Sequence, residues 1–456
     1  MIQAGNKYLS ILKILVALAF PVYYLIMNNY YRLSMDDFSF YCLARKGVIN
    51  GAVAMYKFHE GAFLLEVAII SSFLLTPYVF FIVSLALLYI SFFYFFSSVW
   101  KRFETPMSKT DTFLITSLFI SALYFISPNI PTLWHWMDGT GPYTVMMFVP
   151  ALFILSFLMR GKVLYAMPFL VFFMQTRITW ALIAFGWYFL YCVYDYYKNR
   201  KIDKYKLFTG ILMIAALVIY IIAPGNFHYK KLLVNQSSVN IYQEGGFWWT
   251  MGLIFKGYFL KMTVYALIFF FPICLLVKDE LVEKIRLRGI QLFIPALILV
   301  ISVVLNAVLM YLATERYFHA GRVWNMASFL FAFVFLYYLV LAWKSVEKKL
   351  GAKAFFNAAS WGSVAISIAL GLYLIFKTLY INYPIISAYA AAFDERINQI
   401  TNTKLPKGSE MFVDPLPPSG VLPEWGLKTK RQPNGFLISE YYNLPFEVYV
   451  KEPTKE

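Results

Sequence analysis

Two adjacent carboxylates, Asp36 and Asp37, stand in residues 28–61, the first long polar interruption of a very apolar chain. A carboxylate in this position can act as a general base that takes the proton from an attacking hydroxyl group. The alternative role is structural, with Asp36 capping a helix that begins near Phe38. Since adjacent side chains on a helix or an extended loop point in different directions, one aspartate can face a cleft while the other caps the helix.

His59 and Glu60 end the same polar segment and immediately precede an apolar run. We interpret them as ligands for acceptor hydroxyl groups, or as partners of Asp36 or Asp37 in holding a divalent cation such as Mg²⁺ or Mn²⁺. The structural alternative is a helix cap at the membrane interface. Because no compact metal-binding motif accompanies them, the sequence leaves the metal requirement open.

A second polar segment, residues 129–142, is rich in aromatic side chains and contains the run WHWMDGTGP. Indole faces can stack on a sugar ring while a carboxylate and an imidazole bond its hydroxyl groups, so the segment predicts a carbohydrate-binding loop. The aromatic belt of any membrane protein is the structural alternative. The candidate sugar-binding residues are Trp134, His135, Trp136, Asp138 and Tyr143.

Two further polar segments, residues 224–231 and 313–322, supply cations. Arginine forms bidentate bonds to phosphate oxygens, so the arginines of the second segment are the best candidates for binding a phosphate group. A helix stop at Pro224 and an ion pair within the second segment are the structural alternatives. The candidate phosphate ligands are Arg316, Arg322, His319, Lys230, His228 and Arg177. Asn226 and Glu315 are further candidate sugar or acceptor ligands.

The elements that must position these scattered residues are membrane helices. With 61% hydrophobic and 14% charged residues, the chain is too apolar for a soluble globule and is typical of a polytopic membrane protein. Its net charge of +16 comes from basic residues grouped in short loops between apolar runs. That pattern favours the positive-inside rule over a nucleic-acid-binding stripe, so we expect no nucleic-acid partner.

Eleven apolar runs predict an all-α polytopic fold with about eleven transmembrane helices. They span 8–28, 77–99, 112–128, 143–159, 163–175, 178–195, 207–223, 251–277, 290–312, 323–343 and 355–380. Basic loops alternate with loops poor in basic residues, which predicts a cytoplasmic N-terminus and an extracytoplasmic C-terminus. All four polar segments then fall on the outer side.

The domain organisation follows from this topology. Residues 1–380 form the predicted transmembrane domain, whose outer loop 29–76 carries juxtamembrane helices. Within it, residues 62–76 are too short for a full crossing and predict a helix against the outer leaflet. Residues 381–456 are richer in proline and charge and predict a small extracytoplasmic α+β domain.

Several nucleotide and hydrolase motifs are missing from the sequence, including the Walker loop, GxGxxG after a strand, GxSxG and HExxH. If the outer face has no supply of nucleotide, an enzyme acting there on sugars needs a donor carried in the membrane. A polyprenyl-phosphate sugar meets that requirement.

The layout resembles the GT-C class of integral membrane glycosyltransferases, and more narrowly the bacterial families related to the Gtr-type O-antigen glucosyltransferases. The motifs that carry the resemblance are DDF at Asp36–Phe38, W-x-x-G-x-x-x-Y at Trp136, Gly139 and Tyr143, PGN at Pro224–Asn226, and ER at Glu315–Arg316. The resemblance implies an inverting sugar transfer with a first-loop aspartate as the base. Such families have an arginine near the end of the first outer loop, where this chain has Glu60–Phe63, so phosphate binding moves to Arg316, Arg322 or Arg177.

The sequence therefore predicts a membrane glycosyltransferase at the outer face of a bacterial inner or plasma membrane. Its expected partners are a polyprenyl-phosphate sugar, a cell-surface glycan or lipid-linked acceptor, and membrane lipids. A flippase or transporter of lipid-linked glycans is the alternative, since it would use the same cations without a base. A non-catalytic scaffold of the cell envelope is a third hypothesis.

Overall fold

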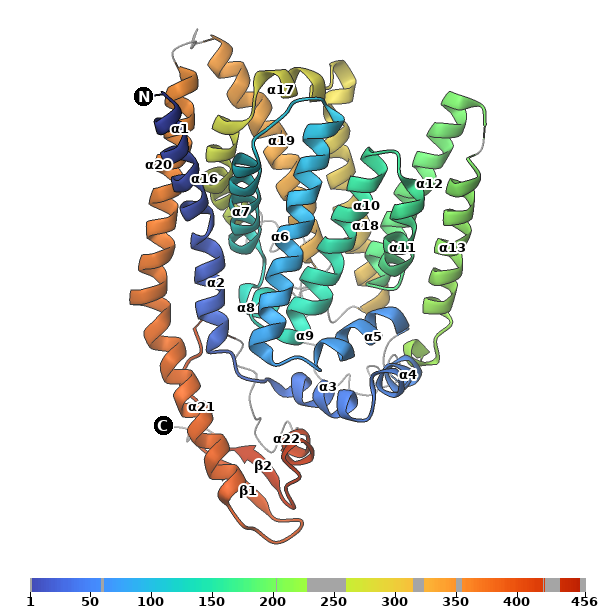
Figure 1. The fold of residues 1–456 in the computed structure, drawn as a ribbon. Coiled ribbons are helices and arrows are strands. Elements are labelled where there is room, and N and C mark those ends of the chain that lie inside the picture. The colour runs from blue at the N-terminus through green and yellow to red at the C-terminus, as the bar shows by residue number, and fades with distance from the viewer. Residues whose placement is uncertain are drawn as a thin grey trace.

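The structure, a computed structural model, describes residues 2–58, 61–201, 203–227, 260–314, 324–349, 355–420, 422 and 435–451. Most of these residues lie in long helices that run roughly along one common axis (Figure 1). The long helices are α1 (Ile2–Ala17), α2 (Ala19–Asn29), α6 (Pro77–Arg102), α7 (Lys109–Ile126), α10 (Met146–Met159), α12 (Ile178–Asn199), α13 (Lys204–Ile221), α16 (Leu260–Leu276), α18 (Ile294–Thr314), α19 (Asn325–Lys349), α20 (Phe355–Phe376) and α21 (Tyr383–Asn402).

Shorter elements connect and cover these helices. They are α3 (Met35–Arg45), α4 (Val48–Phe58), α5 (Phe63–Ser72), α8 (Ile130–Trp134), α9 (Met137–Thr140), η1 (Gly141–Val145), α11 (Val163–Met174), α17 (Asp279–Ile285), η3 (Gly289–Phe293), η5 (Lys377–Asn382), α22 (Gly435–Tyr442) and the strands β1 (Glu410–Val413) and β2 (Glu447–Val450).

The helices confirm a multi-pass membrane protein. Among the described residues, nine helices are long and apolar enough to cross a membrane, or ten if the pair α16 and α17, bent by 109°, is counted as one span. The predicted number of about eleven is higher for two reasons. Run 163–175 forms α11, which has only 12 residues, and run 251–277 lies partly outside the described residues.

The two ends of the helix bundle differ in what they carry (Figure 1). One end, here the α3 end, holds α3, α4, α5, α8, α9, α22 and the strands. The opposite end, here the α17 end, holds α17, the N-terminus, and the turns between α6 and α7 and between α12 and α13. The described parts of polar segments 28–61 and 129–142 therefore lie together at the α3 end.

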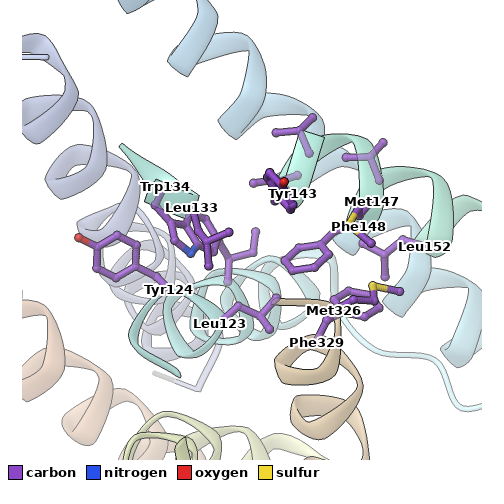
Figure 2. Packing of buried hydrophobic residues seen from close by; sticks show 14 of the residues in the cluster. Leu123, Tyr124, Leu133, Trp134, Tyr143, Met147, Phe148, Leu152, Met326 and Phe329 are labelled. Atoms are coloured by element: carbon purple, nitrogen blue, oxygen red, sulfur yellow. The ribbon is translucent and has the colours of Figure 1, made fainter. Parts of the chain in front are cut away.

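Aromatic side chains fill the bundle between α6, α7, α10 and α19. The rings of Phe148 and Phe329 stack with their centroids 4.5 Å apart, and Phe119 and Phe333 lie 4.7 Å apart. Figure 2 shows this packing continuing through Met147, Leu152 and Met326 on one side and Leu123, Leu133 and Trp134 on the other. Such tight apolar contact fixes the α3-end loops against the spans that carry them.

The C-terminal elements rest against the α3 end. β1 and β2 form a parallel two-stranded sheet in which Glu410 pairs with Glu447. α22 packs on α3, with the rings of Phe38 and Tyr441 5.0 Å apart. The predicted domain boundary at residue 380 falls inside η5, which joins α20 and α21 into one helical run.

Candidate functional site

Asp37 is held by the start of its own helix. Ser34 precedes α3 as its N-cap residue, and Asp37 stands three positions later. The carboxylate oxygen Oδ2 of Asp37 accepts hydrogen bonds from the Ser34 amide at 2.7 Å and from the Ser34 hydroxyl at 3.0 Å. A Ser followed three residues later by an acidic residue is the pattern of a capping box, so the local sequence alone specifies this arrangement.

Tyr31 forms hydrogen bonds both to Asp37 and to the second polar segment. Its hydroxyl donates a hydrogen bond to the same Oδ2 of Asp37 and accepts one from the amide of Met137 at 3.4 Å. Burial holds the pKa of Tyr31 well above its usual range, so the phenol keeps its proton and remains a donor. We call Tyr31, Ser34 and Asp37, with the Met137 amide, the Asp37 cluster.

The Asp37 carboxyl is fully buried, and this sets its acidity. Burial raises the pKa of Asp37 to about 7, while the hydrogen bonds from Tyr31 and Ser34 act in the opposite direction and the charge of Asp36 adds to the rise. Its second oxygen, Oδ1, has no hydrogen-bond partner among the described residues. A carboxyl with these properties can gain and lose a proton near neutral pH, as a general base must.

Asp36 lies half-buried in the first turn of α3. The structural alternative, in which Asp36 caps a helix beginning near Phe38, is wrong, because α3 begins at Met35 and Ser34 is its N-cap. The N-cap residue Ser34 donates its hydrogen bonds to the Asp37 carboxylate and not to Asp36.

The WHW run lies in the protein interior. Trp134, His135 and Trp136 are fully buried. The indole of Trp134 donates to the Ser127 hydroxyl at 2.7 Å. Figure 2 shows Trp134 beside Tyr124 and Leu133. These aromatic faces therefore pack against protein side chains in this structure.

His135 is bonded through both ring nitrogens. Nε2 lies 2.8 Å from the Tyr124 hydroxyl, Nδ1 lies 3.0 Å from the Asn28 side-chain oxygen, and the ring stacks on Tyr24. Burial lowers the pKa of His135 to about 3, so the imidazole is neutral at physiological pH. It joins α2, α7 and the turn between α8 and α9.

Two predicted site residues from different segments meet at the α3 end. The Arg177 guanidinium, between α11 and α12, lies over the Tyr143 ring with its Cζ 4.2 Å from the ring centroid. Both residues are at least half-buried, which favours a cation–π contact. Asp138 is half-buried on α9 nearby in the chain.

Asn226, from the PGN motif, is joined to the end of the first polar segment. Its side-chain oxygen accepts a hydrogen bond from the Gly61 amide at 3.0 Å, and its amide nitrogen donates to the Tyr220 carbonyl at 2.6 Å. The structure therefore brings together two segments that the sequence marked separately.

A pocket of about 300 Å³ lies beside the Asp37 cluster. Tyr31 and Arg32 are in its wall, and Arg32 forms a two-point ion pair, at 2.6 and 2.5 Å, with Asp394 of α21, which also lines the pocket. Sequence analysis missed Tyr31, Ser34 and this ion pair. The Ser34–Asp37 spacing offered a signal for Ser34, whereas no local pattern marks the Tyr31 hydrogen bond or links Arg32 to a residue of the C-terminal segment.

The remaining predicted site residues lie outside the described residues. They are His59, Glu60, His228, Lys230, Glu315, Arg316, His319 and Arg322. Within the part of the chain that the structure describes, no three His, Cys, Asp or Glu side chains are grouped so that they could hold a metal ion. Comparisons with protein-family models, with curated proteins and with solved structures yield no match for this chain.

Proposed function

We propose that this chain is a membrane glycosyltransferase of the GT-C type, with about eleven spans, a cytoplasmic N-terminus and a small extracytoplasmic C-terminal domain. It transfers one sugar from a polyprenyl-phosphate donor to a cell-surface glycan or lipid-linked acceptor at the outer face of a bacterial inner or plasma membrane. The multi-pass helix bundle supports the membrane setting. The concentration of basic loops at the α17 end supports an outward-facing α3 end.

The observation that carries the proposal is the Asp37 cluster. A buried carboxylate whose pKa is raised to about 7, with one oxygen lacking a partner among the described residues, suits a base that acts on a hydroxyl group. Asp37 takes the proton of the acceptor hydroxyl as that oxygen forms a bond to the anomeric carbon. The bond from this carbon to the phosphate oxygen breaks, and the configuration inverts.

The leaving lipid phosphate needs positive charge rather than a proton donor. Arg316 and Arg322 are the proposed ligands, with His319, Lys230 and His228 as helpers. Arg177 is the candidate cation that the structure describes. Its guanidinium lies over the Tyr143 ring, so the face of an aromatic ring is next to this cation. A divalent cation, held with His59 or Glu60, would serve the same neutralising role.

The acceptor has a candidate entrance in the pocket of about 300 Å³. Tyr31 lines this pocket and donates to Asp37, so it connects the space to the proposed base. Pocket walls that combine the tyrosines Tyr31 and Tyr442 with Asn398 suit the mixed apolar and hydroxyl surface of a sugar.

The test uses the purified full chain in lipid nanodiscs with a polyprenyl-phosphate sugar and a glycan acceptor. Asp37→Asn should lower the transfer rate by roughly 100-fold or more, the usual contribution of a general base, while donor binding persists. Asp36→Asn is the matched control. Full transfer by Asp37→Asn would exclude this base, and donor translocation without transfer would establish a flippase instead.

A further inference from the structure

A second pocket lies at the turn between α6 and α7. Figure 1 shows this turn at the α17 end of the bundle, opposite the end that holds α3. The pocket has a volume of about 520 Å³ and is formed by the last turns of α6, the turn at residues 103–108 and the first turn of α7. The sequence indicates here only a basic loop of the kind that sets membrane topology, and the glycosyltransferase proposal gives this turn no role in sugar transfer.

The pocket surface is mainly apolar, and hydrogen-bond donors and cations stand among the side chains that line it. Lys101 and Lys109 are exposed at its mouth. The Trp100 side chain is only 8% exposed and that of Thr105 only 2%, and neither the indole nitrogen nor the hydroxyl has a hydrogen-bond partner among the described residues. Buried donors without a partner are costly, so their presence in a pocket wall points to a ligand that supplies acceptors.

Two more lysines donate hydrogen bonds to the backbone of the same turn. The Lys278 ammonium donates to the Pro106 carbonyl at 2.8 Å, and the Lys284 ammonium donates to the Phe103 carbonyl at 2.7 Å. These bonds occupy backbone acceptors of the turn and bring further positive charge to it. The surroundings therefore favour an anion.

The apolar side of the pocket continues along α6. Ser97 and Phe93 line the pocket one and two turns before Lys101, on the same helix face. The same face continues toward the middle of the helix through Ile90, Leu87 and Val83, which are 58%, 39% and 41% exposed. We call this exposed helix face the stripe of α6. From Leu87 to Ser97 the stripe is about 15 Å long, at about 1.5 Å per residue, and this length is half the thickness of a bilayer core.

We propose that this pocket binds an anionic glycerophospholipid. The phosphodiester lies between Lys101 and Lys109, with Trp100 and Thr105 as additional donors, and one acyl chain follows the exposed stripe of α6. Glu104 also lines the pocket, and as an acceptor it suits the hydroxyl groups of a glycerol head group. The apolar stripe that leads into the site favours a lipid over a free phosphate.

The experiment measures binding of phosphatidylglycerol to the delipidated full chain by native mass spectrometry. Lys101→Gln with Lys109→Gln should weaken binding roughly tenfold or more, because each lysine near an anionic head group contributes about a factor of five. Lys201→Gln with Lys204→Gln is the matched control, since both lysines are exposed, lie at the same end and do not line the pocket. The control pair should change binding less than twofold.

Two further measurements separate a built site from general charge attraction. Thr105→Val should weaken phosphatidylglycerol binding without lowering the thermal stability of the protein. Phosphatidylcholine, which has no net charge, should bind equally to all variants. Equal losses in both lysine pairs, no loss in either, or displacement of the lipid by inorganic phosphate at millimolar concentration would each overturn the proposal.

Discussion

The amide of Gly61 donates a hydrogen bond to the side-chain oxygen of Asn226, 3.0 Å away and 165 residues later in the chain. The Asn226 amide in turn bonds the Tyr220 carbonyl near the end of α13. These two hydrogen bonds join Gly61, at the end of the first polar segment, to the end of the membrane span α13. This contact sets the position of residues that directly follow the proposed acceptor ligands His59 and Glu60.

Replacing Gly61 with alanine should break this junction. A Cβ atom at Gly61 would lie 2.1 Å from the Tyr220 carbonyl oxygen and 2.8 Å from the Ala223 Cβ, so backbone must move. We expect a loss of about 1–3 kcal/mol in the free energy of unfolding, measured in detergent. Gly186→Ala is the control, because nothing lies within 4 Å of a Cβ there; a Gly61 variant as stable as this control would contradict the prediction.

The stability of the protein should respond to the ionisation of Asp37. Its pKa is raised from 3.8 to about 7 in the fold, so the folded state binds the proton more tightly than the unfolded state. Stability should therefore fall as pH rises from about 4 to about 7, and then level off. In Asp37→Asn this decline should be smaller, as followed by thermal unfolding at a series of pH values. Identical pH profiles for the two proteins would exclude a buried, titrating Asp37.

Tyr31→Phe should shift the pH dependence of sugar transfer upward. The hydrogen bond from Tyr31 favours the ionised carboxylate and lowers the pKa of Asp37, so its removal raises that pKa further. The midpoint of the pH profile of kcat/KM, expected near 7, should move to higher pH. Tyr41→Phe is the matched control, because the Tyr41 hydroxyl donates to the Leu75 carbonyl instead. A downward shift, or the same shift in both variants, would refute the role of Tyr31.

His135→Ala should destabilise the protein rather than only weaken sugar binding. The substitution removes a fully buried ring and leaves the side chains of Tyr124 and Asn28 each without one hydrogen bond. We expect a loss of about 2–4 kcal/mol in the free energy of unfolding. His135→Gln, which can keep one of the two bonds, should lose less. Lost transfer with unchanged stability would instead support the predicted sugar contact.

Docking of the C-terminal segment should depend on aromatic packing more than on the exposed Lys46–Glu440 ion pair. Phe38 is buried against Tyr441 and Tyr442 of α22, so Phe38→Ala should cost about 3 kcal/mol and expose the C-terminal segment to limited proteolysis. The Lys46–Glu440 pair is exposed on both sides, and Glu440→Gln should cost less than about 1 kcal/mol. Faster cleavage of Glu440→Gln than of Phe38→Ala would reverse this ranking.

Several features follow from the sequence because they depend on short stretches of chain. Apolar runs long enough to cross a bilayer predict membrane helices wherever they occur, and each of the nine candidate spans among the described residues overlaps a predicted run. The capping box at Ser34 and Asp37 is likewise a matter of spacing within one turn. Composition alone placed the chain among polytopic membrane proteins.

Other features depend on which distant segments pack together, and only the tertiary structure decides them. Burial of Asp37 requires the phenol of Tyr31 and the amide of Met137, which lies 106 residues beyond Tyr31. The same aromatic run that predicts a sugar-binding loop is buried here, because its partners come from α2 and α7. Short-range sequence patterns predict the chemistry that a side chain can perform. The pKa of that side chain and its exposure to solvent depend on neighbouring residues that are distant in the sequence.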